Sequence, residues 1–252
     1  MNDLEDYFEK NDKRQINKWS HYFEIYETFF AKYRNQKVRI LEIGVFQGGS
    51  LQMWKHYFGN NAEIYAIDIE PRCKEFEEEG IKIFIGSQSD RNFLEEIKKE
   101  LPPLDIIIDD GGHTMNQQKI SFEILFDSVK SDGIYLVEDT HTSYWIDYGG
   151  GKKRNGTFIE FAKSLIDDLN AEHSQQKRFN ETKYTRAIKG IYFYDSVVVF
   201  EKKLKKKLEV KMTGKPSYIY KEPYYTKVTK AKRKFEQLLQ FLRIKQLLFP
   251  KD

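Results

Sequence analysis

Short apolar runs alternate with longer segments of mixed polarity along most of the chain. The apolar runs, which are rich in β-branched residues, are Val38–Ile43, Glu63–Asp68, Ile81–Gly86, Leu104–Asp110 and Gly133–Asp139. Continuous apolar runs of this kind are typical of strands that are buried on both faces of a parallel sheet. Helical patterns flank these strands, at residues 16–35, 91–101, 115–128 and 157–171. The alternation predicts a doubly wound α/β sheet.

Residues 184–203 have a different pattern from the segments before them. Two apolar runs meet near Tyr194 and Asp195, which predicts an antiparallel hairpin. The whole pattern therefore predicts an α/β fold of Rossmann-like type, with a mostly parallel sheet and a C-terminal antiparallel hairpin. We expect residues 1–205 to form this domain with its N-terminal helices.

The remaining residues, 206–252, have the composition of a basic extension. From residue 202 to the end there are 16 Lys and Arg against four Asp and Glu, a balance of +12, whereas residues 1–201 carry −9. Residues 202–230, with Pro216 and Pro223, are expected to be irregular, and residues 231–249 to form a basic amphipathic helix. Such a helix packs on its own domain, joins a homo-oligomer or makes a peripheral membrane contact.

Composition excludes several classes of protein. The single Cys73 excludes an internal disulfide framework and is compatible with the reducing cytoplasm, where we expect the protein to act. The polar N-terminal stretch does not resemble a signal or transit peptide, and no stretch approaches the roughly 20 apolar residues of a membrane-spanning helix.

The first predicted strand ends in an acid, Glu42, and continues into the sequence IGVFQGGS, residues 43–50. A strand, a glycine-rich loop and a helix start form the nucleotide site of open α/β sheets. Gly44 and Gly48 allow the backbone to approach a ligand closely. The spacing differs from the dinucleotide motif, and no phosphate-binding lysine follows, which favours a nucleoside without a phosphate chain.

Polar residues at the ends of the next two strands extend this predicted site. Asp68 ends the second strand at the distance from the glycine loop where an acid accepts ribose hydroxyls. Ser87 and Gln88 follow the third strand, where their side chains can meet an adenine edge. We therefore expect all three residues to bind the cofactor.

Acidic residues gather at the ends of the fourth and fifth strands. Asp109 and Asp110 open the sequence DDGGH, and Glu138 and Asp139 end the fifth strand. Because the carboxyl ends of parallel strands meet at one edge, these acids form a plausible Mg²⁺ site. Asp109 is expected to bind the cofactor.

His113 and the loop at residues 141–151 complete the predicted site. His113 lies beside the acids and is the candidate general base, since imidazole titrates near neutrality; His141 is the competing candidate. Aromatic side chains of this loop offer flat faces for an acceptor. The expected acceptor pocket consists of His141, Tyr144, Trp145 and Tyr148.

Four segments together resemble one enzyme family. LEIGVFQGGSLQMWKHYF, DIEPRC, DIIIDDGGHT and VEDTHTSYW are similar to the class I S-adenosylmethionine-dependent methyltransferases, and more narrowly to the metal-dependent O-methyltransferases that modify sugar hydroxyls of macrolides and related glycosides. The resemblance covers about Lys18 to Ala171.

The resemblance implies S-adenosylmethionine and Mg²⁺ as cofactors and a small-molecule or glycan acceptor with a free hydroxyl. It implies that the cofactor is lined by Glu42, Gly44, Ser50 and Asp68, that the metal is held by Asp110, Glu138 and Asp139, and that His113 is the general base. Methyl transfer to a sugar hydroxyl is the expected reaction.

Two alternatives come from other classes. An iron-dependent hydroxylase would use the same acids with His113, but this reaction explains neither the glycine loop nor Asp68. A binding module would use the basic tail on RNA or a membrane. The acidic body weighs against nucleic acid, which we do not expect as a partner.

Overall fold

The computed structural model describes residues 2–174, 179–219, 231–232, 234–235 and 238. The chain divides into two compact units, of which the first comprises residues 1–173 and 181–206 and the second residues 174–180 and 207–252. The sheet and the candidate site belong to the first unit. In the second, residues 207–219 form no helix or strand.

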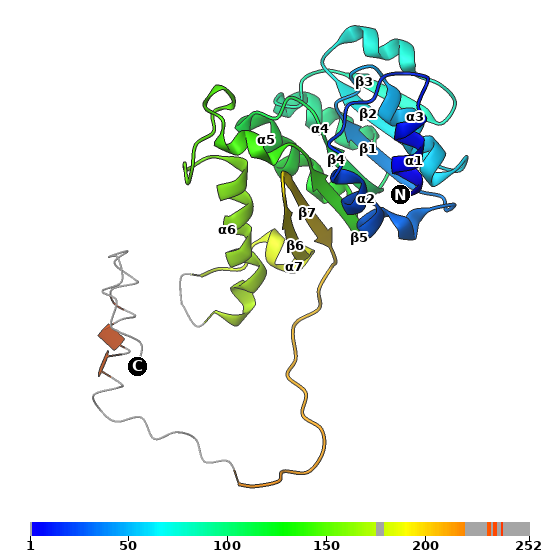
Figure 1. Cartoon of the computed structure of the whole chain (residues 1–252). Helices are drawn as coiled ribbons and strands as arrows, with labels where there is room; N and C mark the ends of the chain where they lie inside the picture. Colours follow the sequence, from blue (N-terminus) through cyan, green and yellow to red (C-terminus); the bar gives the residue numbers. More distant parts are fainter. Residues whose placement is uncertain (1, 175–178, 220–230, 233, 236–237, 239–252) are drawn as a thin grey trace. The chain divides into compact units, whose positions relative to one another are not determined.

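One seven-stranded sheet runs through the first unit in the order β3-β2-β1-β4-β5-β7-β6 (Figure 1). Its strands are β1 (Arg39–Ile43), β2 (Glu63–Asp68), β3 (Ile81–Ile85), β4 (Leu104–Asp109), β5 (Val129–Val137), β6 (Ile188–Tyr194) and β7 (Val197–Lys202). The first five strands pair in parallel, and β7 lies antiparallel between β5 and β6. The predicted sheet and its antiparallel hairpin are confirmed.

Helices cover both faces of this sheet. They are α1 (Asp3–Glu9), α2 (Tyr22–Phe30), α3 (Gly49–Phe58), α4 (Arg91–Glu100), α5 (Met115–Leu125), α6 (Phe158–Asn170) and the short α7 (Lys183–Ala187). Period-two alternation divides the strand residues between two cores. Ile106 and Ile108 of β4 pack with α1, α2 and α3, whereas Ile107 packs with α4, α5 and α6.

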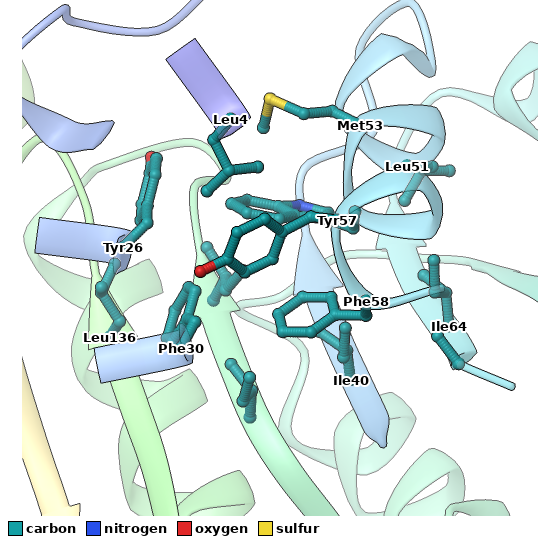
Figure 2. Packing of buried hydrophobic residues seen from close by; sticks show 14 of the residues in the cluster. Leu4, Tyr26, Phe30, Ile40, Leu51, Met53, Tyr57, Phe58, Ile64 and Leu136 are labelled. Atoms are coloured by element: carbon teal, nitrogen blue, oxygen red, sulfur yellow. The ribbon is translucent and has the colours of Figure 1, made fainter. Parts of the chain in front are cut away.

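The core on the α1–α3 face is rich in aromatic side chains. Figure 2 shows Tyr26 and Phe30 of α2 beside Tyr57 and Phe58 of α3, with Leu4 of α1 above them. The Tyr26 ring stacks on Phe30. Aromatic side chains bury large apolar areas, so this cluster stabilises the packing of the N-terminal helices against β1 and β4.

The prediction of one helix over residues 16–35 is wrong in its first part. Residues 15–19 have no regular structure, and α2 begins only at Tyr22, followed by a short 3-10 turn at Ala31–Tyr33. In this irregular segment Lys18 turns into the interior, where it bonds to Asp110 after β4 and to Glu138 after β5. An apolar stripe alone does not reveal this.

The predicted tail helix, residues 231–249, lies mostly outside the described residues. Those that are described, 231–232, 234–235 and 238, have helical backbone conformation. Within the described part of the chain, no helix combines the length and apolar character needed to cross a membrane.

The central strands β1 and β4 continue into loops that touch each other at a glycine. Gly44, at φ +98°, follows β1, and a Cβ added there would lie 2.1 Å from the carbonyl oxygen of Asp110. Gly80, at φ +81°, meets only the carbonyl oxygen of Ala62, at 3.3 Å. The two positions thus share a left-handed backbone but differ in the space around them.

We predict that Gly44→Ala lowers the free energy of unfolding by clearly more than Gly80→Ala. A non-glycine residue in this conformation costs about 1–2 kcal/mol, and Gly44→Ala adds a backbone clash that must push the two loops apart. Chemical denaturation of both variants measures the difference. Equal losses would contradict the close approach of the β1 and β4 loops.

Candidate active site

A cavity of about 560 Å³ opens at the carboxyl ends of β1, β2, β4 and β5. The strand order reverses between β1 and β4, which is where open α/β sheets bind ligands. The predicted site residues that line it are Gly44, Ser50, Asp68, Ser87, Gln88, Asp110, His113, Glu138 and Asp139. The cavity therefore gathers residues from across the sequence.

Other predicted residues lie around the cavity rather than in its lining. Glu42, Gly48, Asp109 and the loop residues His141, Tyr144, Trp145 and Tyr148 are absent from that lining. Gly48 instead begins α3 as its N-terminal cap, with φ +74°. Residues that sequence reasoning missed, Gln15 to Trp19 and Tyr22, contribute one wall.

Asp68 holds the glycine loop in place. Its Oδ2 accepts hydrogen bonds from the backbone N–H groups of Val45 (2.7 Å) and Phe46 (3.1 Å), and its Oδ1 accepts one from Glu70 (2.9 Å). Oδ2 thus uses both of its lone pairs, whereas Oδ1 retains a second one. The carboxylate thus orders the loop and still presents acceptor capacity to the cavity.

Glu42 is buried beneath the loop instead of exposed to a ligand. Ser50 Oγ donates to its Oε2 (2.8 Å) and Trp54 Nε1 donates to its Oε1 (3.0 Å). Burial raises the pKa of Glu42 to about 7, although Lys18 and these two donors oppose the shift. Glu42 therefore fixes the start of α3 relative to β1.

Gln88 and Asp109 form a buried support behind the cavity. Gln88 Nε2 donates to Asp109 Oδ1 (2.9 Å), and Gln88 Oε1 accepts from the backbone N–H of Gly112 (2.7 Å). Asp109 is fully buried, and burial raises its pKa to about 7. The sequence predicts that Asp109 binds the cofactor. In the structure Asp109 does not line the cavity, because the alternation of side chains along β4 turns it toward the α5 face.

The two neighbouring acids, Asp110 and Asp139, meet His113 at the cavity. His113 Nε2 lies 3.5 Å from Asp139 Oδ2 and 3.9 Å from Asp110 Oδ1. One ligand atom from each of these three residues lies within 4.8 Å of the others, an arrangement that can hold a metal ion. Carboxylate oxygens are the donors that Mg²⁺ prefers.

His113 and Asp139 share an uncommon backbone conformation. Their φ angles are +55° and +52°, in the left-handed region that residues other than glycine rarely adopt. Such conformations cost free energy and cluster at functional sites, where surrounding structure enforces them. The hydrogen bond from Thr142 Oγ1 to the carbonyl oxygen of His113 (2.8 Å) joins the two loops.

Glu138 points into the interior below this cluster. It accepts hydrogen bonds from Tyr26 Oη (2.7 Å) and from Lys18 Nζ (2.9 and 3.1 Å). Burial and the charge of Asp110 raise the pKa of Glu138, and Lys18 opposes that shift. Glu138 thus lies next to the Asp110–His113–Asp139 cluster, with its carboxylate bonded to Lys18.

Aromatic rings continue from the cavity along its rim. The His141 ring contacts Trp145 with centroids 4.6 Å apart and Trp19 at 6.0 Å, and Trp145 contacts Tyr148 at 5.7 Å. Trp19 and Trp145 are about half exposed. His141 Nδ1 also forms a hydrogen bond with Ser196 Oγ. Tyr22 Oη lies within hydrogen-bond distance of both Ser196 Oγ and Asp139 Oδ1. The rim offers flat apolar faces beside the cluster.

Comparisons with known proteins agree with this geometry. No protein-family model matches the chain. It is 36% identical to the demethylmacrocin O-methyltransferase of Streptomyces fradiae and 37% identical to the mycinamicin VI 2''-O-methyltransferase of Micromonospora griseorubida, each over 188 residues that make up 70% of this chain and 47% of the relative. The chain thus spans about half the length of the curated relatives it matches.

A solved structure shares the fold. The MycE methyltransferase of the mycinamycin pathway, in complex with Mg, SAH (S-adenosylhomocysteine) and mycinamycin VI, superposes with a TM-score of 0.74 at 31% identity, over 96% of this chain and 59% of that one. The chain has the fold of the class I S-adenosylmethionine-dependent methyltransferases, and its sequence is similar to those of sugar O-methyltransferases.

Proposed function

We propose that this chain is an O-methyltransferase that uses S-adenosylmethionine and Mg²⁺ to methylate a hydroxyl of a sugar or glycoside. The observation that carries the proposal is the meeting of a nucleoside-sized cavity and the Asp110–His113–Asp139 cluster at one edge of the sheet. Relatives named for methylation of glycosylated macrolides and tetracenomycins support the acceptor class.

In this proposal the glycine loop and Asp68 hold the nucleoside. The loop backbone, fixed by Asp68, lines the cavity from Gly44 to Gln47, and Ser87 extends this wall toward the expected position of the adenine. These residues align the donor methyl with the acceptor, which removes much of the entropic cost of reaction.

The acceptor hydroxyl would lie at the His113 cluster. Its oxygen forms a bond to the methyl carbon as the bond from carbon to sulfur breaks, and His113 takes the hydroxyl proton. Asp139, 3.5 Å from His113 Nε2, stabilises the resulting imidazolium. Mg²⁺, when held by Asp110, Glu138 and Asp139, supplies positive charge that favours loss of that proton.

The aromatic rim is the proposed acceptor platform. Trp19 lines the cavity, and its ring contacts that of His141. The His141 ring also contacts Trp145, which in turn contacts Tyr148, and Trp19 and Trp145 are about half exposed. Flat apolar faces suit the carbon-bound hydrogens of a sugar or the fused rings of an aglycone. A homo-oligomer and a membrane contact through the basic tail stay predictions.

The hydroxylase alternative receives less support from the site. An iron facial triad has two histidines and one carboxylate. Among the described residues, the cluster that can hold a metal has one histidine and two carboxylates. A hydroxylase also leaves the cavity beside the glycine loop unused.

We predict micromolar binding of S-adenosylmethionine to the wild-type protein, weakened at least tenfold in Asp68→Asn. Asn donates where Asp accepts, so one loop contact and the acceptor toward the ribose are both lost. Isothermal titration calorimetry measures the affinity. The matched control is Asp90→Asn, since Asp90 also accepts two backbone N–H groups but lies outside the cavity lining. Equal weakening in both variants would argue against Asp68 as a cofactor residue.

His113→Ala should lower the rate of methyl transfer by about 10²–10⁴-fold while leaving the affinity for S-adenosylmethionine unchanged, because general base catalysis contributes about that much. Release of S-adenosylhomocysteine with a panel of glycosylated macrolide and polyketide acceptors gives the rate. His56→Ala, outside the cavity, is the control. A parallel loss of rate and cofactor affinity would remove His113 from the role of base.

Chelation of divalent cations should abolish methyl transfer, and added Mg²⁺ should restore it. Without the metal, the acceptor hydroxyl loses the positive charge that favours its deprotonation. Activity is compared in EDTA, in excess Mg²⁺ and in Asp139→Asn. Full activity in EDTA would reject the metal site.

A further inference from the structure

Lys18 is a buried cation at the centre of the acidic site. Its side chain is 2% exposed, and its Nζ lies 2.5 Å from Asp110 Oδ2, 2.9 Å from Glu138 Oε2 and 3.9 Å from Glu42 Oε1. These carboxylates stand at the ends of β4, β5 and β1. One lysine from the N-terminal segment thus joins three strands of the sheet.

The ammonium is held there by charge. Burial by itself would lower the pKa of Lys18, but the charges of Asp110, Glu138 and Glu42 outweigh burial and raise the pKa above its ordinary value. Removing one partner of a buried ion pair leaves an uncompensated charge, which is strongly destabilising. The acids and Lys18 therefore depend on each other when no metal is bound.

The segment that carries Lys18 is fitted against the cofactor loop. A Cβ on Gly49 would lie 2.4 Å from the carbonyl oxygens of both Arg14 and Gln15, so the chain crosses the start of α3 at close range. The same segment supplies Gln15 to Trp19 to the cavity wall. A movement of Lys18 would therefore change the shape of this cavity wall.

Lys18 holds oxygen atoms of two of the three proposed metal ligands, Asp110 and Glu138. Mg²⁺ binds carboxylate oxygens at about 2.0–2.1 Å and in octahedral geometry. Of the proposed ligands, Asp110 Oδ2 and both oxygens of Glu138 are bonded to Lys18. A divalent cation on these oxygens would lie beside the ammonium, in a buried place where like charges repel strongly.

We propose that Lys18 is an intramolecular competitor of the divalent cation: its ammonium holds Asp110 and Glu138 in the metal-free protein and leaves these oxygens as the metal binds. The inference rests on the proposed metal site of the methyltransferase. It makes metal binding an exchange of one cation for another and couples that exchange to the cavity wall at residues 15–19.

Lys18→Met tests the competition. The expected result is a dissociation constant for Mg²⁺ at least tenfold lower than in the wild type, measured by calorimetry, together with a larger rise of the melting temperature on adding Mg²⁺. The control is Lys130→Met, which removes another partly buried ion pair, Lys130 to Asp105 at 2.7 Å, away from the cavity. It should lower the melting temperature and leave Mg²⁺ affinity unchanged.

The outcomes separate this inference from the proposed function. Mg²⁺ affinity that is unchanged or weaker in Lys18→Met, with measurable binding to the wild type, overturns the competition and leaves the metal site standing. Binding of Mg²⁺ to neither protein, while S-adenosylmethionine still binds, removes the metal site itself and the competition with it. Binding only to Lys18→Met supports the competition.

A measurement on the wild type covers the case in which Lys18→Met does not fold. Buried ammonium hydrogens exchange slowly with water, so the Lys18 Nζ group gives a nitrogen–proton NMR signal in the metal-free protein. Saturating Mg²⁺ should abolish or strongly shift this signal. A signal unchanged at saturating Mg²⁺ would show that Lys18 stays on the acids and would overturn the proposal.

Discussion

Burial of negative charge at the carboxyl edge of the sheet is the constraint on which this site depends. Glu42, at the end of β1, and Glu138, after β5, are almost inaccessible to solvent. Buried carboxylates are costly unless they are paired and hydrogen-bonded. Here Ser50 and Trp54 donate hydrogen bonds to Glu42, and Tyr26 donates one to Glu138. The Lys18 ammonium lies near both carboxylates. The N-terminal segment is thereby part of the site.

The same constraint explains how the fold places its loops. The aromatic core beneath α1, α2 and α3 carries Tyr26 and Trp54, whose polar atoms bond to the buried acids. Core packing and site electrostatics are therefore properties of the same side chains. Behind the cavity, Gln88 joins Asp109 to the backbone of Gly112 and steadies the loop that carries His113. Rigid support of this kind holds catalytic side chains in the geometry that the reaction needs.

The strands could be predicted because each is a continuous apolar run between turn residues. Residues 63–68 and 81–85 match the expected runs almost residue for residue. Strand β5 begins earlier than expected, at Val129; its start was missed because the exposed Ser131 and Asp132 are polar and interrupt the apolar run. The clustering of Asp110 and Asp139 could also be predicted, because both residues follow neighbouring parallel strands whose carboxyl ends meet at one edge of the sheet. A signal for Asp109 was present: period-two alternation puts it on the face of Ile107, toward α5.

Lys18 could not be predicted from local pattern. A lysine between Asn17 and Trp19 looks like part of the solvated side of an amphipathic helix, and its partners lie 92 and 120 residues away in the sequence. The aromatic residues of the loop after β5 were recognisable, but their contact with Trp19 depends on the same irregular segment. Long-range ion pairs are set by tertiary structure, which a single sequence shows only after the fold is known.

The central claim is that the acids after β4 and β5 hold a divalent cation beside the cofactor cavity. Its most direct test is anomalous diffraction at the manganese edge from crystals grown with Mn²⁺ and S-adenosylhomocysteine. The account predicts one peak about 2 Å from carboxylate oxygens of Asp110 and Asp139, with Lys18 Nζ no longer bonded to Asp110. Absence of a peak at this cluster, with Lys18 still between Asp110 and Glu138, would contradict it.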